Sequence, residues 1–383
     1  MIKHERLILE KLTENPMLSQ SELASMLNLT RSSVSVYISN LMRMGYIRGR
    51  GYLIEDHSTV AVIGTASIDY RTAIDEQIFA DLNRTRFLDN NELCISFGGI
   101  GKNVADSIRR IGHNVSYICA VGSDALGREL LDECRQNGVD IGDALIVPAQ
   151  KSSTYLEISS RERQEILISS VNTKLQQSIT PAFLQSKTAK LRHARAIIIE
   201  DGLSEHSLQY ISSNFPAVPV FMICSKPTRV SHFSSFLNQF QGLALSLASA
   251  WALLGEIGTP PTQDSIAMDI ARQLSKKVDG AVLIGYGSSE VVYANQGAVF
   301  FGRYPGSGYR VDAFSHYRDT FASAFFHCLL EDMEGEDLIR YVCACRRIVS
   351  SSKEIVNTQL CPELIATTIQ NLPVEILTSN FSF

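Results

Sequence analysis

The feature that most constrains the fold is an alternation between strongly apolar runs and helical stretches that starts at residue 59. Two of the stretches, "LGRELLDECRQNG" and "TQDSIAMDIARQLSKK", have the apolar spacing of amphipathic helices. The runs are apolar at consecutive positions, as is typical of parallel strands buried on both faces; they are "TVAVIG", "VSYICAVG", "ARAIIIEDG", "VPVFMIC", "GLALSLA" and "GAVLIGYG". The pattern predicts an α/β domain over residues 59–383, with a central, mainly parallel sheet covered by helices.

Two segments, near 70–97 and 152–172, do not follow this alternation. The second contains "TYLEISSRERQEILISSVN", which places two strand-like runs around a polar turn, and the first has a similarly extended pattern. We expect these two segments to form a small β lid over the edge of the sheet.

The first 54 residues have a different pattern, which predicts three short helices and a hairpin. "HERLILEKLTENP", "SQSELASMLNL" and "TRSSVSVYISNLMRMGYI" each have helical spacing, and a Ser or Thr is available to cap the second and the third. The third helix is expected to bury Val34, Ile38, Leu41 and Met42. The alternating "GYIRGRGYLI" predicts a basic hairpin, and the polar stretch at 55–58 is expected to be a linker.

This order of elements resembles the winged helix-turn-helix domains of bacterial regulators. Residues 1–54 carry seven Lys or Arg against four Glu, a charge of +3, whereas the remainder carries −8. The basic segment is therefore expected to meet a polyanion. The resemblance implies that the third helix enters the major groove of double-stranded DNA, with DNA contacts from Arg31, Ser32, Ser33, Ser35, Arg48 and Arg50. The alternative is a helical interaction or dimerisation module whose charges are simply solvated.

Composition narrows the classes of protein further. Of 383 residues, 45% are hydrophobic and 20% are charged, and no apolar run approaches the roughly 18 residues that a membrane span needs. The first residues, "MIKHERLILEKL", lack the apolar core of a signal peptide, so we expect a cytoplasmic protein with no membrane partner. The eight cysteines form no CxxC pair, so we expect reduced, buried thiols and no zinc site.

A glycine-rich stretch, "FGGIGKNVADSIRRIG", is the first candidate for a binding site. Gly98 and Gly99 allow the backbone to pass close to a ligand, and a helix follows with Asn103 in its first turn. Ser67 and Asp69 come after the first buried strand, where a carboxylate can accept hydrogen bonds from neighbouring hydroxyls. These residues predict a grip on a polyol; the alternative is that the glycines serve only to pack the helix against the strand.

These residues carry a resemblance to the PfkB or ribokinase family of sugar and nucleoside kinases, and especially to its pseudouridine-kinase-like members with an N-terminal helix-turn-helix. The pattern "GG.G.N.A....R.G......VG.D..G" is matched from Gly98 to Gly127, and the likeness extends from about 59 to about 372. The resemblance implies a ribokinase-like three-layer sandwich with a small β lid. It also implies that Ser67, Asp69, Gly98, Gly99 and Asn103 bind a sugar or nucleoside.

The nucleotide side of the family site is altered in this chain. Family members carry a "GAGD" turn, in which glycine N–H groups bind phosphate and the Asp removes the proton of the attacking hydroxyl. Here "VDAFSHYRDTFASAFF" has His316, Tyr317 and Arg318 instead of glycines. An alignment with one inserted residue keeps Asp319 as the base and makes Arg318 a candidate anion clamp. An ungapped alignment places Arg318 itself at the base position; we favour the gapped one.

Two further departures lie on the same side. The family motif "N..E", which organises the magnesium shell, aligns with "SLAS", so that Ser246 and Ser249 replace the Asn and the Glu. The nucleotide strand "IGYG" keeps Gly287 as a candidate nucleotide contact but has Gly285 at a Thr position. No metal ligand is assigned, and ATP and Mg²⁺ are expected as cofactors only if kinase activity is retained. The alternative is a functional site built from different residues.

The sequence therefore favours a DNA-binding transcription regulator whose PfkB-like domain senses a sugar or nucleoside, with weak or no phosphoryl transfer. A homodimer is expected, because DNA-binding heads of this kind usually read paired half-sites. The alternative is an active ATP-dependent sugar or nucleoside kinase that carries a DNA-binding domain. A third hypothesis is a purely structural partner protein.

Overall fold

The computed structural model describes residues 2–47, 58–75, 91–162, 166–287, 289–305, 313–352 and 354–379, with the backbone alone at 313–317. The wing arginines Arg48 and Arg50, most of the expected linker, and the side chains of His316 and Tyr317 lie outside the described residues. None of the described helices combines the length and the apolar character of a membrane span.

The N-terminal unit consists of three helices, α1 (Lys3–Glu14), α2 (Gln20–Leu27) and α3 (Arg31–Arg43). Ser19 caps α2 in a reciprocal capping box with Glu22, and the Thr30 hydroxyl accepts a hydrogen bond from the first turn of α3. The three helices share a small core of Ile8, Leu12, Leu23, Ala24, Val34, Ile38, Leu41 and Ile47. One expectation was wrong: Met42 is 40% exposed, because the core-facing stripe of α3 ends at Leu41.

The central sheet has the strand order β15-β14-β13-β12-β11-β10-β9-β1-β4. Its strands are β1 (Thr59–Ile63), β4 (Asn114–Ile118), β9 (Ala196–Glu200), β10 (Val220–Cys224), β11 (Gly242–Ser246), β12 (Ala281–Tyr286), β13 (Glu290–Asn295), β14 (Ala298–Arg303) and β15 (Glu375–Ser379). Pairing is parallel from β4 to β12 and antiparallel from β12 to β15. The parallel part corresponds to the apolar runs of the sequence, whereas the antiparallel edge was not predicted.

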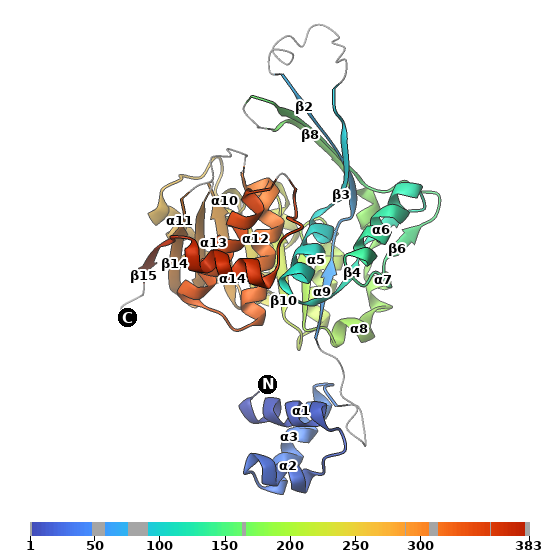
Figure 1. The fold of residues 1–383 in the computed structure, drawn as a ribbon, viewed down its shortest axis with the longest axis vertical. Helices are drawn as coiled ribbons and strands as arrows, with labels where there is room; N and C mark the ends of the chain where they lie inside the picture. Colours follow the sequence, from blue (N-terminus) through green and yellow to red (C-terminus); the bar gives the residue numbers. More distant parts are fainter. Residues whose placement is uncertain are drawn as a thin grey trace.

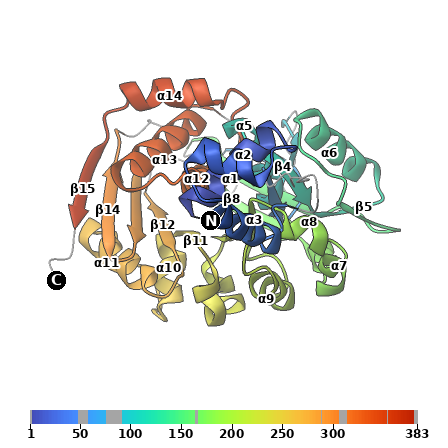
Figure 2. The ribbon, with the colours of Figure 1, turned by 90° about the horizontal axis from the view of Figure 1, so that it is seen from below.

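Helices cover both faces of this sheet (Figures 1 and 2). One face carries α5 (Ile100–Ile111), α6 (Ala125–Gln136), α12 (Ala313–Leu330), α13 (Gly335–Ser350) and α14 (Pro362–Asn371). The other carries α7 (Pro181–Gln185), α8 (Thr188–Arg192), α9 (Glu205–Asn214), α10 (Leu247–Leu253) and α11 (Asp264–Ser275). Alternate residues of each strand point to opposite faces, so Val60 and Val62 join one core while Ala61 and Ile63 join the other. The three-layer fold class is confirmed.

Short elements connect these layers. Strands β5 (Ala120–Gly122) and β6 (Leu145–Val147) form a two-stranded parallel sheet beside α6. Three 3₁₀ turns, η1 (Lys174–Ser178), η2 (Pro227–His232) and η3 (Ser234–Gln239), lie in the connections that follow β8 and β10.

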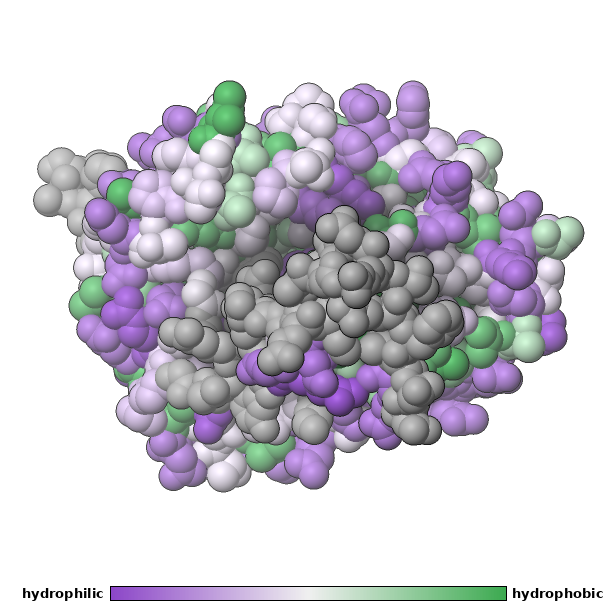
Figure 3. Space-filling view, turned by 90° about the horizontal axis from the view of Figure 1, so that it is seen from above, coloured by the Kyte–Doolittle hydropathy of each residue, from purple (hydrophilic) through white to green (hydrophobic). Residues whose placement is uncertain are grey.

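A second sheet extends away from the body (Figure 1). Its order is β3 (Cys94–Gly98), β2 (Ser67–Ile74), β7 (Thr154–Ser160) and β8 (Ile166–Asn172). These strands come from the two segments expected to form a lid, although residues 76–90 and 163–165 lie outside the described residues. Seen from above, the coloured surface is mainly hydrophilic, with small and scattered hydrophobic areas (Figure 3).

Candidate functional site

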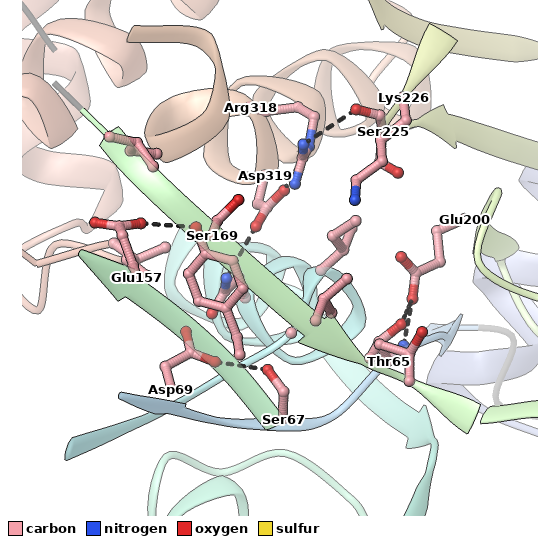
Figure 4. Close-up of a pocket in the computed structure, with 18 of the residues that line it drawn as sticks. Thr65, Ser67, Asp69, Glu157, Ser169, Glu200, Ser225, Lys226, Arg318 and Asp319 are labelled. Atoms are coloured by element: carbon pink, nitrogen blue, oxygen red, sulfur yellow. Dashed lines mark hydrogen bonds and ion pairs between the residues drawn. The ribbon is translucent and has the colours of Figure 1, made fainter. Parts of the chain in front are cut away.

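A cavity of about 440 Å³ lies between the lid and the carboxyl-end edge of the central sheet (Figure 4). Its walls come from the ends of β1, β9 and β10, from the first turns of α5, from the lid strands and from α12. The carboxyl ends of parallel strands meet at one edge of a sheet, so loops far apart in sequence converge there. The lining residues include Thr65, Ser67, Asp69, Arg71, Gly99, Asn103, Tyr155, Glu157, Glu200, Ser225, Lys226, Arg229, Arg318 and Asp319.

Asp69 is the polar centre of the lid side of the cavity. Its carboxylate accepts a hydrogen bond from the Ser67 hydroxyl at 2.6 Å and pairs with the Arg71 guanidinium at 2.7 Å. Burial raises the pKa of Asp69 above its usual value, and the charge of Arg71 offsets part of that rise. The period of two in a strand explains why Asp69 and Arg71 both face the cavity. The same rule brings in Tyr155 and Glu157 from β7, which pairs with β2.

The glycines at the start of α5 are required by close approach of the backbone. Gly99 caps α5 with φ of 100°, a conformation that side chains rarely adopt, and a Cβ at this position would overlap the carbonyl group of Thr65. A Cβ on Gly98 would overlap the carboxylate of Asp69. The glycines can therefore both pack the helix against the strand and leave room for a ligand. Gly99 lines the cavity, and Gly98 packs behind Asp69.

Helix α12 delivers the two residues that the alignment left ambiguous. Asp319 is buried and accepts a hydrogen bond from the Asn103 amide at 2.9 Å, so it lies beside the polyol residues. The Arg318 Nε lies 3.0 Å from the other carboxylate oxygen of Asp319, and its Nη1 is 3.5 Å from the carbonyl oxygen of Ser225 (Figure 4). It is thus Asp319 rather than Arg318 that contacts Asn103, as the gapped alignment requires. The role of Asp319 as a base stays a prediction.

Several polar residues of the cavity were missed at the level of sequence, and Glu200 is the most deeply buried of the acids among them. Glu200 ends β9, is buried, and accepts hydrogen bonds from Thr65 and from the Gln176 amide at 2.9 Å. Burial raises the pKa of Glu200. Its second carboxylate oxygen has no hydrogen-bond partner among the described residues. The available signal was an acidic residue directly after a fully apolar strand, in "AIIIED".

Two cations were missed as well. Lys226 and Arg229 follow β10 in the stretch "CSKPTR" and line the cavity. The buried carboxylate of Asp201 holds this turn in place, because it accepts hydrogen bonds from the backbone N–H of Ser225 at 2.7 Å and of Lys226 at 3.1 Å. A basic pair after a buried strand was the signal.

The residues expected on the nucleotide side have other structural roles. Ser246 caps α10, and its hydroxyl bonds both the backbone N–H and the hydroxyl of Ser249. Gly287 turns the chain between β12 and β13 with φ of 53°, and its carbonyl accepts a hydrogen bond from buried Arg346. Ser246, Ser249 and Gly287 do not line the cavity.

The residues at these positions indicate whether a magnesium–triphosphate group fits the nucleotide side of the site. Mg²⁺ prefers carboxylate and phosphate oxygens in near-octahedral geometry. At Ser246 and Ser249 the strand end offers two hydroxyls that already bond each other. Arg318 brings a full side chain to the second turn of α12, at a position where the alignment expects the bare backbone that surrounds a phosphate in the family. The described residues therefore do not fit the magnesium–triphosphate group in the family's manner.

The start of α3 is only partly available to a DNA surface. Arg31 and Ser32 are exposed, whereas Ser33 and Ser35 are half-buried. The Ser33 hydroxyl bonds Thr30 at 2.8 Å as part of the cap. Val36, which the sequence reasoning did not select, is 58% exposed on the same helix. Arg31, Ser32 and Val36 are thus the best-placed side chains on α3.

Both parts of the chain are similar to known proteins. Residues 58–359 match the model described as pfkB family carbohydrate kinase, and residues 3–48 match the model described as winged helix-turn-helix DNA-binding. "Uncharacterized sugar kinase YeiI" from Escherichia coli (strain K12) is 28% identical over 94% of this chain and 97% of that protein. The pseudouridine kinase of the same strain is 29% identical over 51% of this chain and 61% of that protein.

Solved structures show the same fold. The carbohydrate kinase from Agrobacterium tumefaciens superposes with a TM-score of 0.66 at 21% identity, covering 84% of this chain and all of that one. The family match covers well over half of the residues and includes the cavity. The chain therefore belongs to the pfkB family of carbohydrate kinases and carries a winged helix-turn-helix domain at its N-terminal end.

Proposed function

We propose that this protein is a DNA-binding transcription regulator whose pfkB domain binds a sugar or nucleoside as a signal, with weak or no phosphoryl transfer. The observation that carries the proposal is the pairing of Arg318 with Asp319. Asp319 is the candidate base, and both of its carboxylate oxygens are engaged, one by Arg318 and one by Asn103. Each carboxylate oxygen can accept a second hydrogen bond, so the pairing does not exclude a base, but the Arg318 guanidinium competes with the attacking hydroxyl for Asp319.

The polyol side of the cavity supports ligand binding. One cavity is lined by Asp69, Gly99 and Asn103. The Asp69 carboxylate is held by Ser67 and Arg71. The Asn103 amide is held by Asp319. Preorganised groups of this kind can bind hydroxyls without a conformational search. The serine cap at the end of β11 supports the loss of phosphoryl transfer, because that reaction depends on metal-assisted charge neutralisation.

The N-terminal unit supports the DNA-binding part of the proposal. Arg31, Ser32 and Val36 on α3 offer a cation, a hydroxyl and a methyl-bearing side chain, which can contact phosphate, base edges and thymine methyl groups. We propose that the protein acts in the cytoplasm, where it has access to DNA.

A homodimer is part of the proposal. The lid strands alternate, so the face opposite the cavity carries Ile95, Leu156 and Ile168, which are 55%, 39% and 44% exposed. An exposed apolar face is a typical self-association surface. Ligand-dependent movement of the lid would then change the relation between two DNA-binding units.

The proposal is tested by two measurements on the full chain. Genomic fragments that the protein retains are sequenced, and protection of the strongest site is footprinted with and without ribose, fructose, uridine, pseudouridine and inosine. We expect protection at a specific site that changes with one member of the panel. Arg31→Ala should weaken binding roughly tenfold, whereas Arg6→Ala, an exposed arginine of α1, serves as the control.

An ADP-release assay over the same panel, with ATP and Mg²⁺, forms the second measurement. We expect no release above that of Asp319→Asn. Sequence-independent DNA binding, or a footprint that neither a panel member nor its phosphate ester changes, would contradict the regulator.

The second candidate function is an ATP-dependent sugar or nucleoside kinase. The observation that favours it is the retention of Asp319 beside Asn103 in the same cavity as Asp69. In that case Arg318 would release Asp319 on substrate binding and would contact the transferred phosphoryl group. ADP release that depends on one panel member and is abolished by Asp319→Asn would establish this function.

A further inference from the structure

On the basis of the sensor function proposed above, we propose that the ligand is a phosphomonoester of a pentose or nucleoside. Its phosphate would lie among Lys226, Arg229 and Arg318, and its free hydroxyls would face Asp69 and Asn103. The cavity would thus bind a phosphorylated metabolite directly, with no metal ion and no second nucleotide.

The three cations come from two neighbouring elements. Lys226 and Arg229 follow β10, and Arg318 lies in α12; all three line the cavity. Arg318 reaches the carbonyl oxygen of Ser225, the residue next to Lys226, so the two elements meet there (Figure 4). Arginine and lysine side chains that converge on one point are the usual means of binding a phosphate group.

Two of the carboxylates near these cations, those of Asp319 and Asp201, already have partners. Glu200 lines the same cavity and has one carboxylate oxygen without a hydrogen-bond partner among the described residues, and burial raises the pKa of Glu200. Asp319 is paired with Arg318 and bonded by Asn103. Asp201 accepts hydrogen bonds from the backbone N–H groups of Ser225 and Lys226 and from the Ser225 hydroxyl at 2.6 Å. The Asp201 carboxylate is also buried, so it is directed at the turn rather than at a ligand.

The ammonium group of Lys226 feels the charge of Asp201 but is not paired with it. It makes no hydrogen bond or ion pair with any residue that the structure describes. Arg229 forms an ion pair with Asp201 at 3.7 Å, a distance longer than that of a hydrogen bond. Partial burial and the charges of Arg229 and Arg318 lower the pKa of Lys226. An anion placed between the three groups would relieve this repulsion.

The two ends of the cavity are linked by the Asn103–Asp319 hydrogen bond. A ligand that satisfies both ends must carry hydroxyls at one end and an anion at the other. A volume of about 440 Å³ is within the range of pockets for small ligands of this kind. A phosphomonoester needs only cationic side chains, whereas a triphosphate also needs a metal site that the serine cap of α10 does not provide.

The experiment is isothermal titration of the full chain without ATP or divalent metal. Ribose, uridine, pseudouridine and inosine are each compared with their 5′-phosphate, and inorganic phosphate is titrated separately. We expect at least one ester to bind tenfold or more tightly than its parent, with inorganic phosphate competing for the same site. Lys226→Met should weaken binding of that ester by roughly ten- to a hundredfold. Lys277 is an exposed lysine after α11, and Lys277→Met should leave the ratio of the ester's affinity to its parent's affinity unchanged.

The inference is overturned if every parent binds as tightly as its ester, or if no ester binds. It is also overturned if the preference for the ester survives in both Lys226→Met and Arg229→Gln while their thermal midpoints match the unmodified protein. The sensor function fails separately. A footprint that no ester changes would contradict the sensor function but not the phosphate site. A footprint that responds only to the unphosphorylated parents would contradict the phosphate site but not the sensor function.

Discussion

The two ends of the cavity differ in how their polar groups are supported. At the lid end, Asp69 is held by a neighbouring hydroxyl and by Arg71, and the adjoining glycines have no space for a Cβ. At the α12 end, a side chain occupies the place of a glycine, and its guanidinium pairs with the candidate base. The lid end is constrained by backbone packing, whereas the other end depends on which side chains the second turn of α12 carries. Under the proposed function, this fold keeps a binding pocket while a few side chains at one end remove the phosphoryl transfer.

The largest effect is expected at the lid end, from Gly99→Ala. The φ of 100° and the overlap of a new Cβ with the Thr65 carbonyl should cost about 3–5 kcal/mol of unfolding free energy. Gly255→Ala is the matched control, because Gly255 has φ of 88° and open space around it; it should cost about 1 kcal/mol. Urea unfolding followed by the single tryptophan, Trp251, measures both. Equal losses would show that the close approach does not matter.

Asp69→Asn should have the next largest effect, on binding rather than stability. Loss of a charged acceptor should weaken binding of whichever panel sugar or nucleoside binds by roughly a hundredfold, or about 2–3 kcal/mol. Asp132→Asn, at an exposed position of α6, is the control. Titration calorimetry measures the affinities. Unchanged affinity in Asp69→Asn would place the polyol elsewhere and would remove the contrast between the two ends.

Ser246→Ala tests whether Ser246 only caps α10 or belongs to a nucleotide site. Loss of the cap of α10 should cost about 1 kcal/mol of stability, with no change in ligand affinity or ADP release. Ser204→Ala removes the equivalent cap of α9 and should behave in the same way. A response to ATP and Mg²⁺ that is lost in Ser246→Ala but kept in Ser204→Ala would mean that the serine belongs to a working nucleotide site.

An effect of similarly small size on the acid sensitivity of the fold is expected from a histidine pair that does not line the cavity. His113 and His327 hydrogen-bond each other at 2.8 Å, and burial lowers both pKa values, that of His327 to about 4. The unfolded chain then binds more protons between about pH 6.5 and 4, so stability is full above that window and falls as the pH falls through it. His327→Gln should reduce this loss by on the order of 1 kcal/mol. Urea unfolding at pH 5 and 7 measures it, with exposed His206→Gln as the control.

The sequence predicted the structure correctly where a residue type has a single role that depends only on its neighbours along the chain. The consecutive apolar residues of β1, β9, β10, β11 and β12 predicted the parallel sheet, and the caps at Ser19 and Thr30 marked helix starts. The antiparallel edge from β13 to β15 was missed, because short half-apolar strands resemble loops and their pairing is not local. Met42 was misplaced because a helical stripe does not show where the partner helix ends.

Of the candidate site, the motif residues Ser67, Asp69, Gly99 and Asn103 were predicted together, and the structure brings them into one cavity. Glu200, Lys226 and Arg229 were not predicted. Glu200 ends β9, whereas Lys226 and Arg229 both follow β10, and no spacing along the chain relates the acid to the two cations. Their convergence results from the order of the parallel strands, which the sequence does not reveal.

The amino-acid sequence by itself determined the periodicities that specify strands and helices, the glycines near Asp69, and the absence of glycines before Asp319. These are local properties, since they depend on backbone conformation and on neighbours within one turn or strand. Only the tertiary structure decided that Arg318 pairs with Asp319 and lies near Lys226 and Arg229. Arg318 and Asp319 are neighbours in sequence, but the contact of Arg318 with the turn after β10 joins segments about ninety residues apart. The strength of these interactions depends on burial that only the packed fold creates.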